Sequence, residues 1–276
     1  CTPIQAGILS KTLSGADATG RAQTGTGKTA AFLITILNHF HKNPAPSPRS
    51  PGTPRALILA PTRELVLQIE KDARGFSKYT DVSSLAVFGG MDYQKQQRRL
   101  KEGTIDIVAA TPGRLLDFKR KGDIHLGKVE ILVIDEADRM LDMGFLPDIR
   151  RILKYLPSKR QTLFFSATMP NEIAKLSREM LHDPFAISVE RQSGPAVGIT
   201  QAAYPVAQHL KPVLLTELMK RGIIRSVIVF TRTKARANRL ADYLVRMGVS
   251  SGRIHGDRSQ SQRTETMRRF KEGKFS

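Results

Sequence analysis

Short apolar runs alternate with helical patterns along most of this chain, and the alternation restricts the folds that it can adopt. The runs are four to six residues long, as is typical of strands that are buried on both faces. Helical segments between such strands predict a parallel sheet with helices on both faces, which is an α/β fold. The expected strands are residues 56–60, 85–88, 105–109, 129–134, 162–165 and 227–230, and the expected helices include residues 63–79, 93–101, 149–155 and 172–181.

A phosphate-loop pattern precedes the first of these strands. A small residue is followed by four positions and then by Gly27-Lys28-Thr29, with Ala in place of the usual first Gly. Gly25 and Gly27 allow the backbone to bend so that its amides converge on phosphate oxygens, Lys28 supplies a positive charge, and the Thr29 hydroxyl suits Mg²⁺. A Gly/Thr-rich loop that binds no ligand is the alternative. The predicted nucleotide-binding residues are Ala22, Gln23, Thr24, Gly25, Thr26, Gly27, Lys28 and Thr29.

An acidic pair, Asp135-Glu136, follows the most hydrophobic run. An acidic pair at the end of a buried strand, downstream of a phosphate loop, is the Walker B arrangement. We expect Asp135 to belong to the Mg²⁺ shell together with Thr29, and Glu136 to polarise the attacking water. The predicted catalytic residues are therefore Lys28, Asp135 and Glu136. A solvated acidic helix start is the alternative.

Further polar clusters follow other predicted strands. Ser166-Ala167-Thr168 carries hydroxyls that are expected to bond to Asp138 and to couple the nucleotide site to bound nucleic acid. Three more clusters offer helix-start amides, two of them with Thr and Arg as well, and together they predict a track for a phosphodiester backbone. Taken singly, each cluster fits an ordinary strand-to-helix turn, because Thr is a good N-cap. The predicted track consists of Pro61, Thr62, Arg63, Gly89, Gly90, Thr111, Pro112, Gly113 and Arg114.

The formal net charge of +19 sets this chain apart from an average soluble protein. Such a surface attracts polyphosphate ligands, of which nucleic acid is the commonest, although a basic surface that is simply well solvated is the alternative. Cys1 is the only cysteine, so no internal disulfide forms. No stretch has the length of a transmembrane helix or the pattern of a signal peptide. We therefore expect a cytoplasmic protein that does not bind membranes.

At 276 residues the chain is long enough for two domains. Residues 190–198 mix Gly, Pro, Ser, Gln and charge, which predicts a linker between domains at residues 1–189 and 199–276. The second domain has no phosphate loop of its own, so we expect it to share the first domain's nucleotide. Because the sequence begins with Cys and ends just after a helical pattern, it is expected to be a fragment. In the second domain the expected strands are residues 199–206, 227–230 and 252–256, and the expected helices are residues 210–221, 234–247 and 263–271.

The motifs in this order resemble the DEAD-box RNA helicases, and the resemblance covers essentially the whole chain. Residues 21–32, 115–118 and 133–145 are most similar to the bacterial RhlB-type members. The resemblance implies two RecA-like parallel-sheet domains of the P-loop NTPase type, the second of them incomplete here. It also implies ATP and Mg²⁺ as cofactors, single-stranded RNA as the substrate, a role in RNA turnover, and an RNA-degradation complex as a partner.

The resemblance also assigns roles residue by residue. Gln5 matches the glutamine that reads adenine, a role that its residue type alone does not favour over helix surface. Ser166, Ala167 and Thr168 match the segment that couples ATP hydrolysis to unwinding. In the second domain, the RNA-contacting positions implied by the resemblance are Thr231, Arg232, Gln260 and Arg263.

Two departures from the family pattern lead to a specific expectation. The aromatic residue upstream of Gln5 and the last two motifs of the second domain are not in the sequence. The last motif supplies arginines that face the γ-phosphate. In related phosphate-loop enzymes, a comparable arginine finger increases the rate of hydrolysis by a factor of about 10³–10⁵. We therefore expect this chain to bind ATP and RNA but to turn over slowly. An ATP-dependent RNA clamp without productive hydrolysis and a DNA translocase on the same two-domain plan remain as alternatives.

Overall fold

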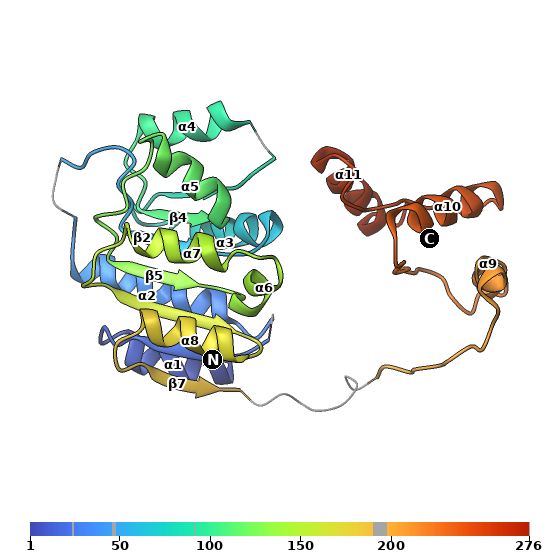
Figure 1. Cartoon of the computed structure of the whole chain (residues 1–276), viewed down its shortest axis with the longest axis horizontal. Coiled ribbons are helices and arrows are strands. Elements are labelled where there is room, and N and C mark those ends of the chain that lie inside the picture. Colours follow the sequence, from blue (N-terminus) through green and yellow to red (C-terminus); the bar gives the residue numbers. More distant parts are fainter. Residues whose placement is uncertain (24, 46–47, 91, 190–197, 276) are drawn as a thin grey trace. The chain divides into compact units, whose positions relative to one another are not determined.

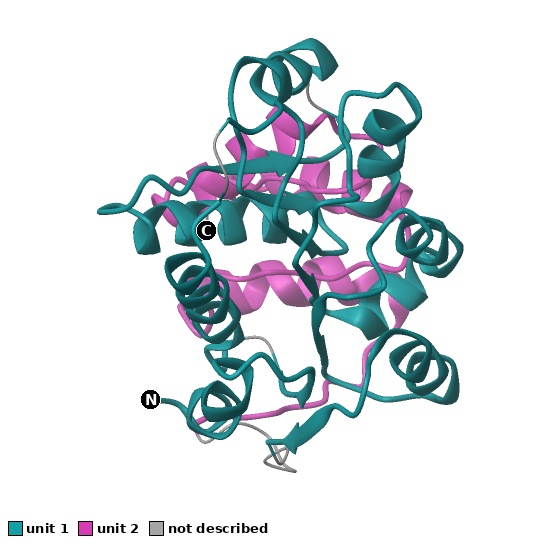
Figure 2. Cartoon of the chain, turned by 90° about the vertical axis from the view of Figure 1, so that its left-hand side faces the viewer, with its two compact units in different colours: residues 1–194 teal, residues 195–276 magenta. Residues whose placement is uncertain are grey.

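The computed structural model describes residues 1–23, 25–45, 48–90, 92–189 and 198–275. The chain divides into two compact units, Cys1–Gly194 and Pro195–Ser276, which Figure 2 colours separately. Residues 190–197 of the predicted linker lie outside the described residues. Within the part of the chain that is described, no helix is both long and apolar enough to span a bilayer.

The first unit is built on one seven-stranded sheet in the order β3-β4-β2-β5-β6-β1-β7 (Figure 1). Every pairing in this sheet is parallel, so all strands end at the same edge. This confirms the α/β class and the parallel sheet that the apolar runs predict. The strands are β1 (Ala18–Arg21), β2 (Ala56–Leu59), β3 (Ser84–Val87), β4 (Ile107–Ala110), β5 (Ile131–Ile134), β6 (Gln161–Ser166) and β7 (Phe185–Ser188).

Helices cover both faces of the sheet and form two separate hydrophobic cores (Figure 1). Successive side chains of a strand point to opposite faces of the sheet, so each strand contributes to both cores. In β2, Leu57 and Leu59 pack in one core, whereas Ala56 and Ile58 pack in the other. Helices α1 (Pro3–Thr12), α2 (Lys28–Lys42) and α3 (Arg63–Phe76) supply the second core. The first core receives side chains from α4 (Tyr93–Glu102), α5 (Pro112–Arg120), α6 (Ala137–Asp142), α7 (Leu146–Leu153) and α8 (Asn171–Met180).

Strands β1 and β7 are not among the strands that the apolar runs predict, and β1 shows one reason. Its sequence, Ala-Thr-Gly-Arg, contains no apolar run, yet the strand lies between β6 and β7. Gly20 is required there because a Cβ would come within 2.6 Å of the Phe165 ring on β6. The bulky Phe165 ring therefore requires Gly at position 20, and β1 lacks the apolar run by which a buried strand is recognised in a sequence.

The second unit consists of helices and extended segments. Helices η1 (Gln208–Leu210), α9 (Lys211–Lys220), α10 (Lys234–Arg246) and α11 (Gln260–Lys271) confirm the three helical patterns of this half. The strands expected at residues 199–206, 227–230 and 252–256 are wrong for the described residues, none of which is in a paired strand there. A strand needs a hydrogen-bonded neighbour, and Phe230, which is 93% exposed, shows that the apolar run lacks a covering layer.

Candidate nucleotide site and nucleic-acid interface

The phosphate loop connects the end of β1 to the start of α2, at the edge where the strands end. The Ala22 amide donates to the Ser166 carbonyl at 3.1 Å, which continues the β1–β6 pairing into the loop. Gly25 and Gly27 have φ values of 85° and 91°, in the left-handed region that favours Gly. The predicted loop geometry is therefore present, with Lys28 as the first residue of the helix.

Lys28 is almost fully buried and joins the loop to the acidic pair. Its Nζ donates to the Ala22 carbonyl at 3.1 Å and lies 3.4 Å from Asp135 Oδ1. Burial raises the pKa of Asp135 above its ordinary value, and the Lys28 ammonium opposes this rise. The sheet thus brings together two of the three predicted catalytic residues, because β1 and β5 both flank β6.

Glu136, the third predicted catalytic residue, has an unusual backbone. Its φ of 54° places a residue other than Gly in the left-handed region, where such residues are rare. This turn lets the Glu136 amide donate to Asp135 Oδ1 at 3.0 Å. Its carboxylate forms an ion pair with Arg139 at 3.2 Å. Strained residues of this kind cluster at functional sites, which agrees with the predicted role.

Gln5 reaches the phosphate loop from α1. Its Nε2 donates to the Gly27 carbonyl at 3.1 Å, and its Oε1 accepts from the Thr2 amide at 2.9 Å. A primary amide has two N–H groups and two lone pairs, so these two bonds use one of each. The predicted reading of adenine by Gln5 stays a prediction. Within the loop itself, Thr26 Oγ1 donates to the Gln23 carbonyl at 2.8 Å. Thr24 lies outside the described residues.

The expected contact between the Ser166-Ala167-Thr168 segment and Asp138 is confirmed. Asp138 Oδ2 accepts from both the amide and the hydroxyl of Thr168 at 2.8 Å, and the Asp138 amide donates to Ser166 Oγ at 3.1 Å. Burial raises the pKa of Asp138, but the hydrogen bonds from Thr168 and Ser166 outweigh it and hold the pKa below its ordinary value. The coupling role of this segment stays a prediction.

The residues available for Mg²⁺ are the oxygen donors Thr29 and Asp135. Among the described residues, no group of three or more His, Cys, Asp or Glu side chains converges to form a cage for a metal ion. Mg²⁺ is usually held by one or two carboxylates together with substrate phosphates, so this sparse donor set fits that ion beside a bound nucleotide.

The predicted nucleic-acid track follows β2, β3 and β4, which are neighbours in the sheet. Thr62 caps α3 by accepting from the Leu65 amide at 3.3 Å, and Thr111 is the N-cap residue before Pro112 at the start of α5. Gly90 has a φ of 81°, and a Cβ there would overlap the Arg63 guanidinium. The structure thus places the segment after β2 against the segment after β3. Pro61 and Gly89 adjoin these contacts in sequence, and Gly113 lies in the first turn of α5.

Arg114, the last residue of the track, lies against two aromatic rings. Its guanidinium carbon is 5.4 Å from the centroid of Tyr93 and 5.9 Å from that of Phe118. Neither ring belongs to one of the predicted polar clusters. Phe118 stands four residues after Arg114 on one helix, which is a readable signal, whereas Tyr93 belongs to α4 and is brought there only by tertiary structure.

The sheet order separates the two sets of residues. The predicted nucleotide-binding and catalytic residues follow β1, β5 and β6, whereas the predicted nucleic-acid track follows β3, β4 and β2. Each group of residues therefore occupies its own half of the edge at which the strands end. The two halves meet where β2 pairs with β5. A single edge therefore presents both predicted sites on adjacent strands.

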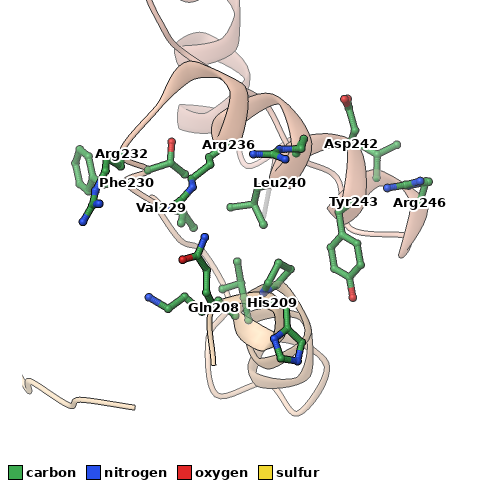
Figure 3. A pocket seen from close by; sticks show the side chains of 16 residues that line it. Gln208, His209, Val229, Phe230, Arg232, Arg236, Leu240, Asp242, Tyr243 and Arg246 are labelled. Carbon is green, nitrogen blue, oxygen red and sulfur yellow. The ribbon is translucent and has the colours of Figure 1, made fainter. Parts of the chain in front are cut away.

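The second unit contains a cavity of about 1270 Å³ between η1, α9, α10 and residues 229–232 (Figure 3). Thr231 and Arg232 line this cavity beside Phe230, and Arg236 and Arg246 project from α10. Gln260 and Arg263 do not line it; they lie in the first turn of α11, where Arg263 Nη2 donates to Gln260 Oε1. The four implied RNA-contacting residues of this unit therefore form two groups.

The comparisons with known proteins agree with this geometry. The profile of the DEAD/DEAH box helicase family matches residues 2–176, and that of the helicase conserved C-terminal domain matches residues 210–276. The chain belongs to the DEAD/DEAH box helicases. The resemblance to DEAD-box RNA helicases is therefore confirmed, and with it the expectation that the chain is an enzyme of the ATP-hydrolysing class.

Curated relatives match along the full chain. The chain is 48% identical to ATP-dependent RNA helicase RhlB of Pseudomonas syringae pv. tomato and 46% identical to that of Pseudomonas putida, and it covers 70% of each. It is 44% identical to ATP-dependent RNA helicase RhlB of Xanthomonas axonopodis pv. citri and covers 48% of that protein. The expected similarity to RhlB-type members is confirmed.

Proposed function

We propose that this helicase binds ATP with Mg²⁺ where β1, β5 and β6 end, and holds the backbone of single-stranded RNA where β2, β3 and β4 end. The observation that best supports the ATP site is that Lys28 Nζ lies 3.4 Å from Asp135 Oδ1. This ion pair lies beside a loop in which two glycines have left-handed backbone conformations. RNA as the substrate is supported by the names of the curated relatives, which are ATP-dependent RNA helicases.

In the proposed ATP site, the loop amides of residues 22–29 surround the phosphates and Lys28 neutralises their charge. Thr29 and Asp135 hold Mg²⁺, which neutralises developing charge on the phosphate oxygens when bound. Glu136 accepts the proton of the attacking water, and Arg139 orients its carboxylate through their ion pair. Gln5 links adenine recognition to the loop through its bond to the Gly27 carbonyl.

In the proposed RNA site, the amides at the starts of α3 and α5 and the side chains of Arg63 and Arg114 contact phosphates without reading bases. The net charge of +19 supports this backbone mode, which predicts a strong dependence of affinity on salt. Asp138, Ser166, Ala167 and Thr168 transmit the state of the nucleotide to this site. In the second domain, we assign RNA contacts to Thr231, Arg232, Gln260 and Arg263.

The domain limits at residues 1–189 and 199–276 remain part of this proposal, as do a cytoplasmic location and a partner complex for RNA degradation. The slow-turnover expectation and the clamp and DNA-translocase alternatives receive no support from the comparisons. They remain untested predictions.

The substitution Glu136→Gln tests the proposed reaction. The amide cannot accept a proton, so we expect unchanged affinity for ATP and loss of RNA-stimulated phosphate release. Glu172→Gln makes the same change on an exposed side chain of α8 and should leave both measurements unchanged. Phosphate release by Glu136→Gln at the parent rate would remove Glu136 from its assigned role.

A further inference from the structure

Arg114 lies in a cluster with one aromatic ring from α4 and one from its own helix, α5. The rings of Tyr93 and Phe118 stack with centroids 4.5 Å apart and an interplanar angle of 26°. The Arg114 guanidinium lies within 6 Å of both rings, which is the range of cation–π attraction. Its Nη1 atom is buried and has no hydrogen-bond partner among the described residues. Aromatic packing therefore contributes to fixing this guanidinium.

Tyr93 is fixed in turn by a buried carboxylate. Its hydroxyl donates to Asp123 Oδ2 at 2.7 Å, Gln97 Nε2 donates to Asp123 Oδ1 at 2.9 Å, and Lys101 Nζ lies 3.1 Å from Asp123 Oδ1. Tyr93, Gln97 and Lys101 are four residues apart, so they form one stripe along α4. Asp123 follows α5 in the chain, and these contacts therefore tie α4 to the end of α5.

The ionisation of these groups agrees with a rigid contact. Burial and the bond to Asp123 raise the pKa of Tyr93 to about 12. Burial also raises the pKa of Asp123, but the hydrogen bonds from Gln97, Tyr93 and Lys101 outweigh it and hold the pKa below its ordinary value. At neutral pH the phenol is thus a donor and the carboxylate is an acceptor.

We propose that Tyr93 is a positioning residue for RNA binding, which holds the Arg114 guanidinium in the orientation that meets a backbone phosphate. This inference rests on the proposed RNA contact of Arg114. The Arg side chain has several rotatable bonds. If its conformation is fixed before RNA binds, less conformational entropy is lost on binding.

The test measures binding of a labelled oligouridylate in the presence of a non-hydrolysable ATP analogue, at several salt concentrations. We expect Tyr93→Leu to weaken binding about three- to tenfold, the equivalent of the cation–π contact with Arg114. The substitution also removes the contact with Lys121, whose Nζ lies 4.0 Å from the Tyr93 centroid. Tyr93→Phe keeps the ring and loses only the bond to Asp123, so its loss should be smaller. Tyr155→Leu is the matched control, since Lys119 lies 4.7 Å from the centroid of that ring, and it should bind RNA as the parent does.

A double-mutant cycle separates positioning from direct contact. If Tyr93 acts through Arg114, then Tyr93→Leu added to Arg114→Ala should weaken binding no further. Both single variants should also reduce the slope of log affinity against log salt, by up to about 0.7 for one lost phosphate contact. Thermal unfolding reports whether each variant folds, and if Tyr93→Leu does not, the cycle with Tyr93→Phe decides.

The outcomes distinguish this inference from the proposed function. Unchanged RNA binding by Arg114→Ala would overturn the proposed contact and the positioning role with it. Weaker binding by Arg114→Ala that the Tyr93 variants do not share would overturn the positioning role alone. Additive losses in the cycle would also overturn it, because Tyr93 would then affect RNA binding independently of Arg114.

Discussion

Lys28 Nζ and Asp135 Oδ1 lie 3.4 Å apart, and the two side chains are only 6% and 3% exposed. The ammonium belongs to the first turn of α2 and the carboxylate to the residue after β5, so this ion pair connects the phosphate loop to the acidic pair. A buried charge that loses its partner is costly. The pair therefore contributes to stability as well as to the proposed chemistry, and the two contributions are separable.

Replacing Lys28 by Met should show both contributions. The substitution removes the charge but keeps an unbranched side chain, so we expect ATP affinity to fall more than tenfold. It also leaves Asp135 without its cation, which should lower the free energy of unfolding by on the order of 3 kcal/mol at neutral pH. Nucleotide titration and chemical unfolding measure the two effects.

Two further variants make the Lys28 experiment specific. Lys28→Met combined with Asp135→Asn leaves no buried unpaired charge, so stability should recover while ATP binding stays weak. Lys234→Met breaks the exposed ion pair with Asp257 and should leave unfolding nearly unchanged. If the double variant were as unstable as Lys28→Met alone, loss of the ion pair would not be the cause of the destabilisation.

The lowered pKa of Asp138 should make the free energy of unfolding depend on pH in the acidic range. Its pKa in the folded protein lies below the ordinary value of about 4, so it stabilises the folded state fully above that value. This stabilisation is lost as pH falls through the folded pKa. We therefore expect Asp138→Asn to be less stable than the parent at neutral pH, with a difference that shrinks as pH falls below about 4.

Thr168→Val refines the Asp138 experiment. It removes the hydroxyl donor but keeps the amide donor to Asp138, so its destabilisation should be smaller than that of Asp138→Asn. Denaturant unfolding of all three proteins between pH 3 and pH 7 measures the effect. A difference between parent and Asp138→Asn that did not change over this interval would contradict the assignment.

Gly90→Ala should weaken RNA binding specifically. A residue with a Cβ is strained at a φ of 81° by about 1–2 kcal/mol, and the Cβ also displaces the Arg63 guanidinium. We expect lower affinity for oligouridylate and unchanged affinity for ATP. Gly15→Ala has the same kind of strain, at a φ of 93°, but its Cβ meets no neighbour. Gly15 precedes β1, at the opposite edge of the sheet, so its variant should bind RNA normally.

Equal losses of RNA affinity in Gly90→Ala and Gly15→Ala would show that backbone strain alone is responsible. The comparison uses fluorescence anisotropy with labelled oligouridylate at one fixed salt concentration. Of the two substitutions, only Gly90→Ala displaces Arg63, so the difference in RNA affinity between the two variants measures the effect of that displacement.

The sequence determined the elements whose signal is local. Apolar runs predicted β2 to β6, because a strand buried on both faces must be hydrophobic along its whole length. The spacing of Gly25, Gly27 and Lys28 predicted the phosphate loop, since backbone bending and charge are properties of those residues themselves. The order of the motifs indicated the family without any tertiary contact.

Only the tertiary structure decided how these elements combine. The order β3-β4-β2-β5-β6-β1-β7 divides one edge between two sites, and no local pattern encodes it. The contacts of Lys28 with Asp135 and of Tyr93 with Arg114 join segments far apart in sequence. Strand β1 was missed because Phe165 on its neighbour selects Gly20. Among the described residues of the second unit, the extended segments are not in paired strands. Packing and pairing depend on what lies across the sheet, so they appear only in the folded chain.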